Sequence, residues 1–323
     1  FPYTTLFRSL REFLAESGRD LEDIYRFTNV SWSALKFDAG LMDEQIRNRD
    51  LASRIKAFTH VNDWERLNAY TALLVGEFVP WAALSERERR YRSMFFWLLW
   101  RDGRRTPTER WKSIDEAMLA LRDDKVLVAE LVDLFSYLLE KVDGLKVRLK
   151  FSFADIPLFA HANYTLDEML GASGYARVPG CMITELDGPF RGADSMRQGV
   201  AYVDEIKLDL LTVTLNKSSG YSATTRYRDF AEARDVFHWE SQSTTTLASP
   251  TGQRYVSQRP GLSDVLLAIR EEKKTVLGAQ SYRLAGLCDY VRHEGEAPIS
   301  IWWKLRLALG VAEFKAAAAV NVA

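Results

Sequence analysis

The sequence lacks most of the features that mark disulfide-rich proteins, metal proteins and membrane proteins. Its two cysteines, Cys181 and Cys288, are too few for a disulfide framework or a cysteine zinc site, and they fit a reducing compartment. The longest apolar run, from Met94 to Trp100, is far shorter than the ~20 residues that cross a bilayer. We therefore expect a cytoplasmic protein with no membrane partner.

The motifs of nucleotide and nucleophile chemistry are also missing. No GxxxxGK[ST] loop and no DExH box occur, which are the sequences that hold ATP phosphates and magnesium. There is no GxSxG elbow for a serine nucleophile. No HxxxH or CxxC pair offers metal ligands. We expect the chain by itself to have no catalytic residues, no metal site and no cofactor.

The composition is that of an ordinary globular protein. The 323 residues are 47% hydrophobic and 27% charged, with a formal net charge of −1. This balance excludes a globally basic protein, although it allows a local basic patch. The length suggests about two domains.

The chain divides into segments by the spacing of its apolar residues. The first nine residues resemble vector-derived sequence, and we expect a non-native leader over 1–9. Residues 10–145 have helical spacing and predict a helical array. Residues 146–180 form a transition, residues 181–312 predict an antiparallel β domain, and residues 313–323 form a tail.

Local patterns support this division. Ser85 is placed to cap a helix, and the capping-box pattern from Thr165 to Glu168 opens another. Apolar and polar residues alternate from Lys146 to Phe153 and from Ile299 to Leu309, which predicts strands. The predicted fold class is α+β, a helical array followed by an antiparallel β-sheet or β-barrel.

The most unusual segment is residues 212–255, where hydroxyl, amide, aromatic and charged side chains are crowded. Such groups are costly to bury unpaired, so they face a ligand or water, or they hydrogen-bond one another. Trp239 and Tyr227 could stack bases. Alternatively, Trp239 fills the core of a barrel that polar contacts hold together. The candidate nucleic-acid-binding residues here are Asn216, Lys217, Tyr227, Asp229, His238, Trp239, Ser241, Gln242, Arg254 and Tyr255.

A second candidate lies in the basic, aromatic segment 86–112. Its Gly-Arg-Arg tip carries Arg104 and Arg105, which could reach a phosphate backbone. The alternative is a solvated helix face with ion pairs between successive turns.

A nuclease site is a further alternative. Glu205 and Lys207, with Asp187 or Asp194 upstream, superficially match the carboxylates and lysine of metal-dependent nucleases. An exposed strand face would explain the same pattern. Carboxylates that could join such a site are Asp229 and Glu240.

Several longer segments resemble a known family. They are TVTLNKSSGYSATTRYRDF, FHWESQSTTTLASPTGQRY, LLAIREEKK and YVRHEGEAPISIWWKL. These are similar to the uncharacterised bacterial domain family numbered 3427, found at the C-terminus of superfamily-II DEAD/DEAH-type helicases. LREFLAESGRDLEDIYR and DIPLFAHANYTLDEMLGASG resemble the helical region before that domain.

The resemblance implies a fragment of a superfamily-II DNA helicase or translocase from a restriction or phage-defence context. ATP and Mg²⁺ would then belong only to the helicase core that this chain lacks. The implied partners are DNA, the helicase core of the same chain, and a nuclease or other defence subunit. We expect a nucleic-acid-binding or docking module; a metal-dependent nuclease and a structural protein-interaction domain are the alternatives.

Overall fold

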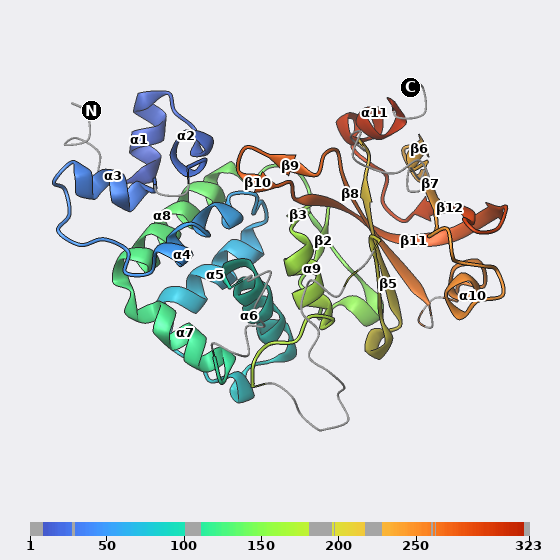
Figure 1. The fold of residues 1–323 in the computed structure, drawn as a ribbon, viewed down its shortest axis with the longest axis horizontal. Helices are drawn as coiled ribbons and strands as arrows, with labels where there is room; N and C mark the ends of the chain where they lie inside the picture. Colours follow the sequence, from blue (N-terminus) through green and yellow to red (C-terminus); the bar gives the residue numbers. More distant parts are fainter. Residues whose placement is uncertain are drawn as a thin grey trace.

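The computed structural model describes residues 9–27, 30–100, 111–180, 196, 198–216, 228–259, 261 and 263–319. The expected leader lies outside these ranges except for Ser9. A helical half and a sheet half lie side by side, which confirms the α+β class (Figure 1). In the ranges given above, no helix is long and apolar enough to cross a membrane.

The helical half packs its helices around a cluster of aromatic rings. The ring of Phe58 lies 5.1 Å from that of Phe95 and 5.4 Å from that of Phe135, between centroids. Its elements are α1 (Leu10–Ser17), α2 (Leu21–Tyr25), α3 (Trp32–Asp38), α4 (Arg49–Ala52), η1 (Ile55–Phe58), α5 (Trp64–Val75), η2 (Trp81–Ala83), α6 (Glu86–Leu99), α7 (Ile114–Asp123) and α8 (Lys125–Lys141).

The predicted helix starts are confirmed. Ser85 accepts a hydrogen bond from the backbone N–H of Glu88, whose carboxylate accepts one from the Ser85 N–H. Thr165 and Glu168 form the same capping box at the start of α9 (Leu166–Ser173).

The strand predicted from Lys146 to Phe153 is wrong beyond its first residues. Strand β1 covers only Val147–Arg148, and η4 (Phe151–Phe153) is a turn of 3₁₀ helix. The Phe153 N–H donates to the Lys150 carbonyl, and this turn brings the Phe153 side chain into the core. Two further short strands precede α9, namely β2 (Phe159–Ala160) and β3 (Asn163–Tyr164).

The main sheet is mixed rather than antiparallel throughout. Strands β5 and β8 run parallel, with Leu208 opposite Asp264, and the chain between them forms β6, β7 and α10. The strand order is β4-β5-β8-β11-β12-β7-β6, with β3 beside β11. The bounds are β4 (Val200–Val203), β5 (Leu208–Thr214), β6 (Phe230–Ala233), β7 (Val236–Glu240), α10 (Pro250–Val256), β8 (Asp264–Arg270), β11 (Tyr282–Glu294) and β12 (Ser300–Leu305).

The sequence predicts either an open sheet or a closed barrel, and the sheet does not close into a barrel. Among the described residues, no pairing joins the outer strands β4 and β6. A hairpin of β9 (Lys274–Thr275) and β10 (Gly278–Ala279) extends from the sheet toward the helical half (Figure 1).

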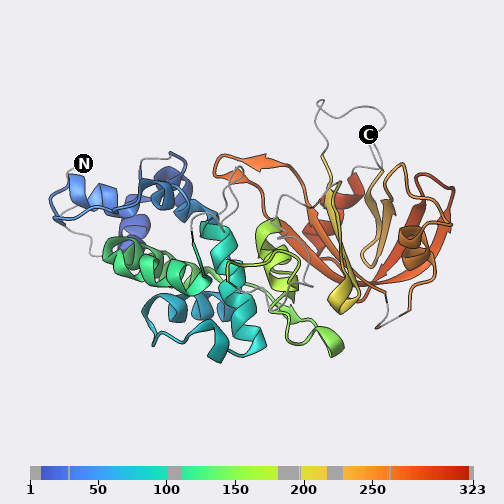
Figure 2. The ribbon, with the colours of Figure 1, turned by 60° about the horizontal axis from the view of Figure 1, so that its bottom comes forward.

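The two faces of the sheet belong to different cores. Leu208, Leu266 and Leu284 pack in one cluster with the helical half, and α9 lies between the helices and this face (Figure 2). On the other face, Trp303 packs with Tyr255 of α10 and with Ala317 of α11 (Val311–Ala319). The helical half therefore covers one of the two faces of the sheet.

Candidate nucleic-acid interface

The crowded segment 212–255 proves to be largely buried. Trp239 is 4% exposed, and its ring lies 5.3 Å from that of Tyr255 and 6.5 Å from that of Trp303. Tyr255 and Trp303 are themselves fully buried. The stacking role proposed for Trp239 therefore needs correction, because neighbouring rings occupy the space where a base would stack.

Buried polar groups of this segment bond to the protein itself. The Ser241 hydroxyl accepts from the Ile299 N–H at 2.9 Å, and the His238 Nδ1–H donates to the Arg228 carbonyl at 2.6 Å. An Asp229 oxygen accepts from the backbone N–H of Glu240 at 3.1 Å. Such pairing is what buried polar groups require. These contacts serve the sheet rather than a ligand.

Arg254 is half-buried and paired with a buried carboxylate. It donates to both oxygens of Asp209 at 2.9 and 3.1 Å and lies 3.8 Å above the ring of Tyr202. Burial raises the pKa of Asp209, and the charge of Arg254 opposes that rise. The guanidinium is thus engaged on the carboxylate and on the ring.

The remaining candidates are less enclosed or lie outside the described residues. The Gln242 side chain accepts from the Thr245 hydroxyl at 3.1 Å, and Asn216 is exposed. The candidates outside the described residues are Lys217, Tyr227, Arg104 and Arg105.

The proposed nuclease residues do not converge where they are described. Glu205 pairs with Arg177 at 3.2 Å, and Lys207 pairs with Asp204 at 2.6 Å, in a short 3₁₀ turn rather than on a strand. Glu240 accepts from the Arg228 N–H at 2.9 Å. Across the described ranges, no three His, Cys, Asp or Glu side chains cluster as a metal site would require. Asp187 and Asp194 lie outside those ranges.

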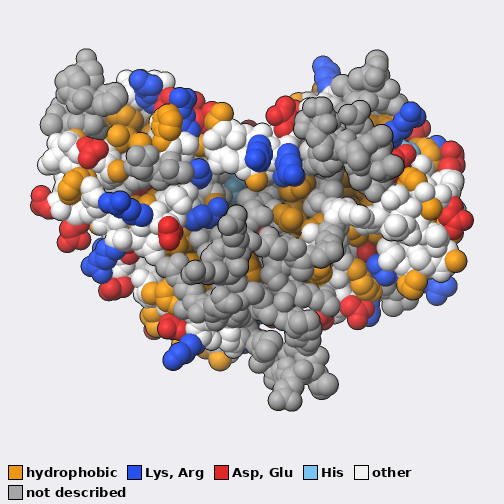
Figure 3. Space-filling view, in the orientation of Figure 1, with side chains coloured by type: hydrophobic (Ala, Val, Ile, Leu, Met, Phe, Trp, Pro, Cys, Tyr) orange, Lys and Arg blue, Asp and Glu red, His pale blue; other side chains and the backbone are white. Residues whose placement is uncertain are grey.

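A cleft of about 780 Å³ opens between the helical half and the β9–β10 hairpin. Figure 3 shows a hollow between the two halves with Lys or Arg side chains in it. The charged lining residues are six cations and three carboxylates, so the cleft is cationic. They are Arg54, Lys56, Lys141, Arg270, Lys273 and Lys274, against Asp20, Glu22 and Asp167.

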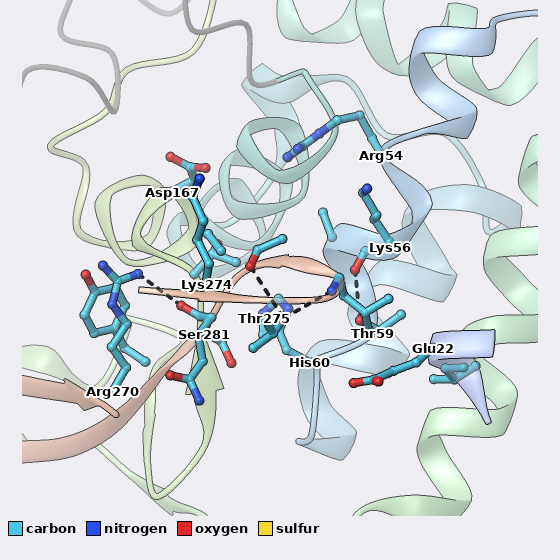
Figure 4. A pocket seen from close by; sticks show the side chains of 18 of the residues that line it. Glu22, Arg54, Lys56, Thr59, His60, Asp167, Arg270, Lys274, Thr275 and Ser281 are labelled. Carbon is cyan, nitrogen blue, oxygen red and sulfur yellow. Dashed lines mark hydrogen bonds between the residues drawn. The ribbon is translucent and has the colours of Figure 1, made fainter. Parts of the chain in front are cut away.

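The cations of the cleft come from both walls. Figure 4 shows Lys56 on the helical side, in η1, and Lys274 on the hairpin. Neither amine makes a hydrogen bond or ion pair with any residue that the structure describes. Lys141 ends α8, with its amine 5.4 Å from the ring of Tyr137. These amines are therefore available to an anion in the cleft.

The cleft wall on the helical side is fixed by a buried ion network. His60 lines the cleft, and its Nε2 lies 2.6 Å from a Glu168 oxygen. The other Glu168 oxygen accepts from Arg66 at 2.8 Å and from the Tyr70 hydroxyl at 3.0 Å. Burial alone would raise the pKa of Glu168, but the charges of Arg66 and His60 outweigh it and lower that pKa to about 2.

Arg270 marks the end of the cleft. Its guanidinium donates to the Thr214 hydroxyl at 2.9 Å and to the Gln280 carbonyl at 3.2 Å, and it lies 4.3 Å over the ring of Tyr282. These contacts fix a cation on the rigid strand β8.

Sequence reasoning missed the cleft. Lys56, Lys141 and Lys274 lie far apart in the chain, so no motif joins them. The one local signal was the Lys273-Lys274 pair within LLAIREEKK.

The fold and the cleft thus define an α+β protein with a cationic groove. Residues 189–307 match the family described as Domain of unknown function (DUF3427). The match covers the hairpin wall with Arg270, Lys273 and Lys274, whereas the helical wall lies outside it. No curated protein matches the chain.

Proposed function

We propose that this chain is a nucleic-acid-binding module whose cleft holds the phosphates of a DNA strand. The observation that carries the proposal is the pair of open amines, Lys56 and Lys274, on opposite walls of one groove. Lysine and arginine at this density neutralise phosphates and release bound counterions.

The carboxylates of the cleft offset this charge only in part. Asp20 caps α2, where its Oδ1 accepts from the backbone N–H groups of Glu22 and Asp23. Asp167 is buried in the first turn of α9, where the helix dipole favours a negative charge. Among the exposed charges that line the groove, the three lysines Lys141, Lys273 and Lys274 outnumber the two carboxylates of Asp20 and Glu22.

We further propose that the module belongs to a superfamily-II DNA helicase whose ATPase core lies elsewhere in the parent protein. The resemblance over residues 199–305 and the family match over 189–307 support this. The coding sequence upstream should then contain a GxxxxGK[ST] loop and a DExH box. An intact upstream sequence without them would contradict the helicase assignment.

The binding proposal is tested by titrating the chain into fluorescently labelled single-stranded and duplex DNA at several salt concentrations. The Lys56→Ala/Lys274→Ala variant loses two phosphate contacts. The slope of log affinity against log salt should fall by about 1.4 for a single strand, at about 0.7 per contact.

The matched control is Lys125→Ala/Lys150→Ala, which removes the same charge from exposed positions outside the cleft. Its slope should equal that of the wild type. Equal losses in both variants would show only a general charge effect. Absence of salt-dependent binding to either DNA would refute the proposal and favour a protein-docking role for the groove.

A further inference from the structure

A second pocket of about 280 Å³ adjoins the cationic cleft. Arg270, Gln280 and Ser281 line both cavities, so the two share a border. The volume is close to the lower end of the range for small-molecule sites, which suits one small planar group.

The lining of this pocket combines apolar side chains with polar and charged ones. Leu215, Ile269 and Leu309 line it with Ala316 and Ala317 of α11, whose small side chains leave the space open. Asn163, Gln280 and Ser281 also line the pocket, and the Gln280 amide oxygen already accepts from the Glu272 N–H at 2.6 Å. These groups offer hydrogen-bond donors and acceptors of the kind that read base edges.

The charges at the second pocket balance, in contrast to those of the cleft. Its two cations, Arg270 and Arg283, are equal in number to its two carboxylates, Glu271 and Glu313. Arg283 and Glu313 form an ion pair at 2.9 Å. A phosphate gains little from such a site, whereas a flat, uncharged group with hydrogen-bonding edges fits it.

We propose that the second pocket accepts one unstacked nucleobase of a single strand whose phosphates lie in the cationic cleft. This rests on the proposed function and specifies its substrate as single-stranded nucleic acid. Arg270 stands where the strand passes from one cavity to the other, with its guanidinium directed by Thr214 and Gln280. A base in a duplex would have to leave its stack to enter.

The test compares two oligomers with the same phosphates, oligothymidylate and a chain of abasic tetrahydrofuran units. Wild-type protein should bind the abasic oligomer about tenfold more weakly, which is the scale for loss of one base contact. Ala316→Phe fills the pocket from α11. It should weaken oligothymidylate binding about tenfold and leave abasic binding unchanged.

The control variant is Val311→Phe, which adds a ring to the same helix at a position that is 57% exposed and outside the pocket. It should bind both oligomers as the wild type does. Unchanged abasic binding by Ala316→Phe also shows that this variant is folded.

Two results would overturn the base pocket while leaving phosphate binding in place. One is equal affinity of the wild type for both oligomers, and the other is an equal loss for both oligomers in Ala316→Phe. A failure of the cleft itself is different, because neither oligomer would then show salt-dependent binding to the wild type.

Discussion

The molecule has two polar regions that its structure uses in opposite ways. Around Trp239, the hydroxyls, imidazole and carboxylates bond to the backbone or to each other and are largely buried. In the cleft, Lys56 and Lys274 are partly or fully exposed and make no bond to another described residue. Both regions are rich in polar groups, and they differ in whether those groups have partners within the protein.

The difference teaches that a concentration of polar groups is not itself a binding site. Hydroxyls and imidazoles satisfied inside the fold contribute to stability, because leaving a buried partner unpaired is costly. Amines left without a partner near a cavity are the groups that a ligand can still engage. The following changes should affect stability in the first region and affinity in the second.

The largest effect should come from Trp239→Ala. Removing this buried ring leaves a cavity between Tyr255 and Trp303 and should lower the free energy of unfolding by about 3–5 kcal/mol. Urea titration measures the loss, and DNA affinity per folded molecule should stay the same. Trp64→Ala, at a position that is 56% exposed, should change stability by no more than about 0.5 kcal/mol. A loss of DNA affinity in folded Trp239→Ala would show instead that residues 212–255 form a binding surface.

Acid should weaken the wall of the cleft through Glu168. Its pKa is about 2 in the folded chain against an ordinary value of 4.5. Its contribution to stability is complete above pH 4.5 and is lost as the pH falls from there toward 2, because the unfolded chain takes up the proton first. The difference corresponds to about 3 kcal/mol.

Urea midpoints measured across that pH window test this contribution. The urea midpoint of Glu168→Gln should fall less than that of the wild type as the pH is lowered. Glu16→Gln, at an exposed site in α1, should follow the wild-type curve. An unchanged slope in Glu168→Gln would mean that other carboxylates cause the acid sensitivity.

Ser241→Ala should have a smaller effect. It leaves the buried N–H of Ile299 without its side-chain acceptor, at a cost of about 1–3 kcal/mol. Thermal unfolding measures it, with Ser257→Ala in an exposed position as the control. An unchanged melting temperature in Ser241→Ala would show that the contact between the ends of β7 and β12 does not depend on the hydroxyl.

The smallest effect on stability should come from Lys141→Ala, below about 1 kcal/mol, since the contacts of this exposed lysine within the described residues are with the end of α8 and the face of the Tyr137 ring. Its effect should appear in DNA binding, where the salt slope for a single strand should fall by about 0.7. Lys125→Ala, roughly 24 Å away at the other end of α8, should leave the slope unchanged. Equal slopes of log affinity against log salt in both variants would show that Lys141 does not contact DNA.

Local features of the fold could be predicted from the sequence because their causes are local. The capping boxes at Ser85 and Thr165 depend on residues three positions apart. The strand predicted within Ile299–Leu309 follows from its alternating apolar residues, and β12 covers Ser300–Leu305 of it. The α+β class follows from the change in apolar spacing along the chain.

Features that depend on distant pairing could not be predicted in this way. The parallel register of Leu208 with Asp264 joins segments separated by β6, β7 and α10. The cleft joins Lys56 to Lys274 across most of the chain. Residue types alone did not show that Trp239 would meet Trp303 rather than a ligand.

Strand β3 has a consequence for how this protein can be inherited and recombined. It pairs with β11, with Tyr164 opposite Tyr282 and Asn163 opposite Arg283, which ties β11 to residues outside the 189–307 family segment. A gene fusion that carried only that segment would expose the apolar face of the sheet that α9 and the helices cover. The unit that evolution can move intact is therefore longer than the recognisable domain, and shuffled copies should carry these upstream residues with them.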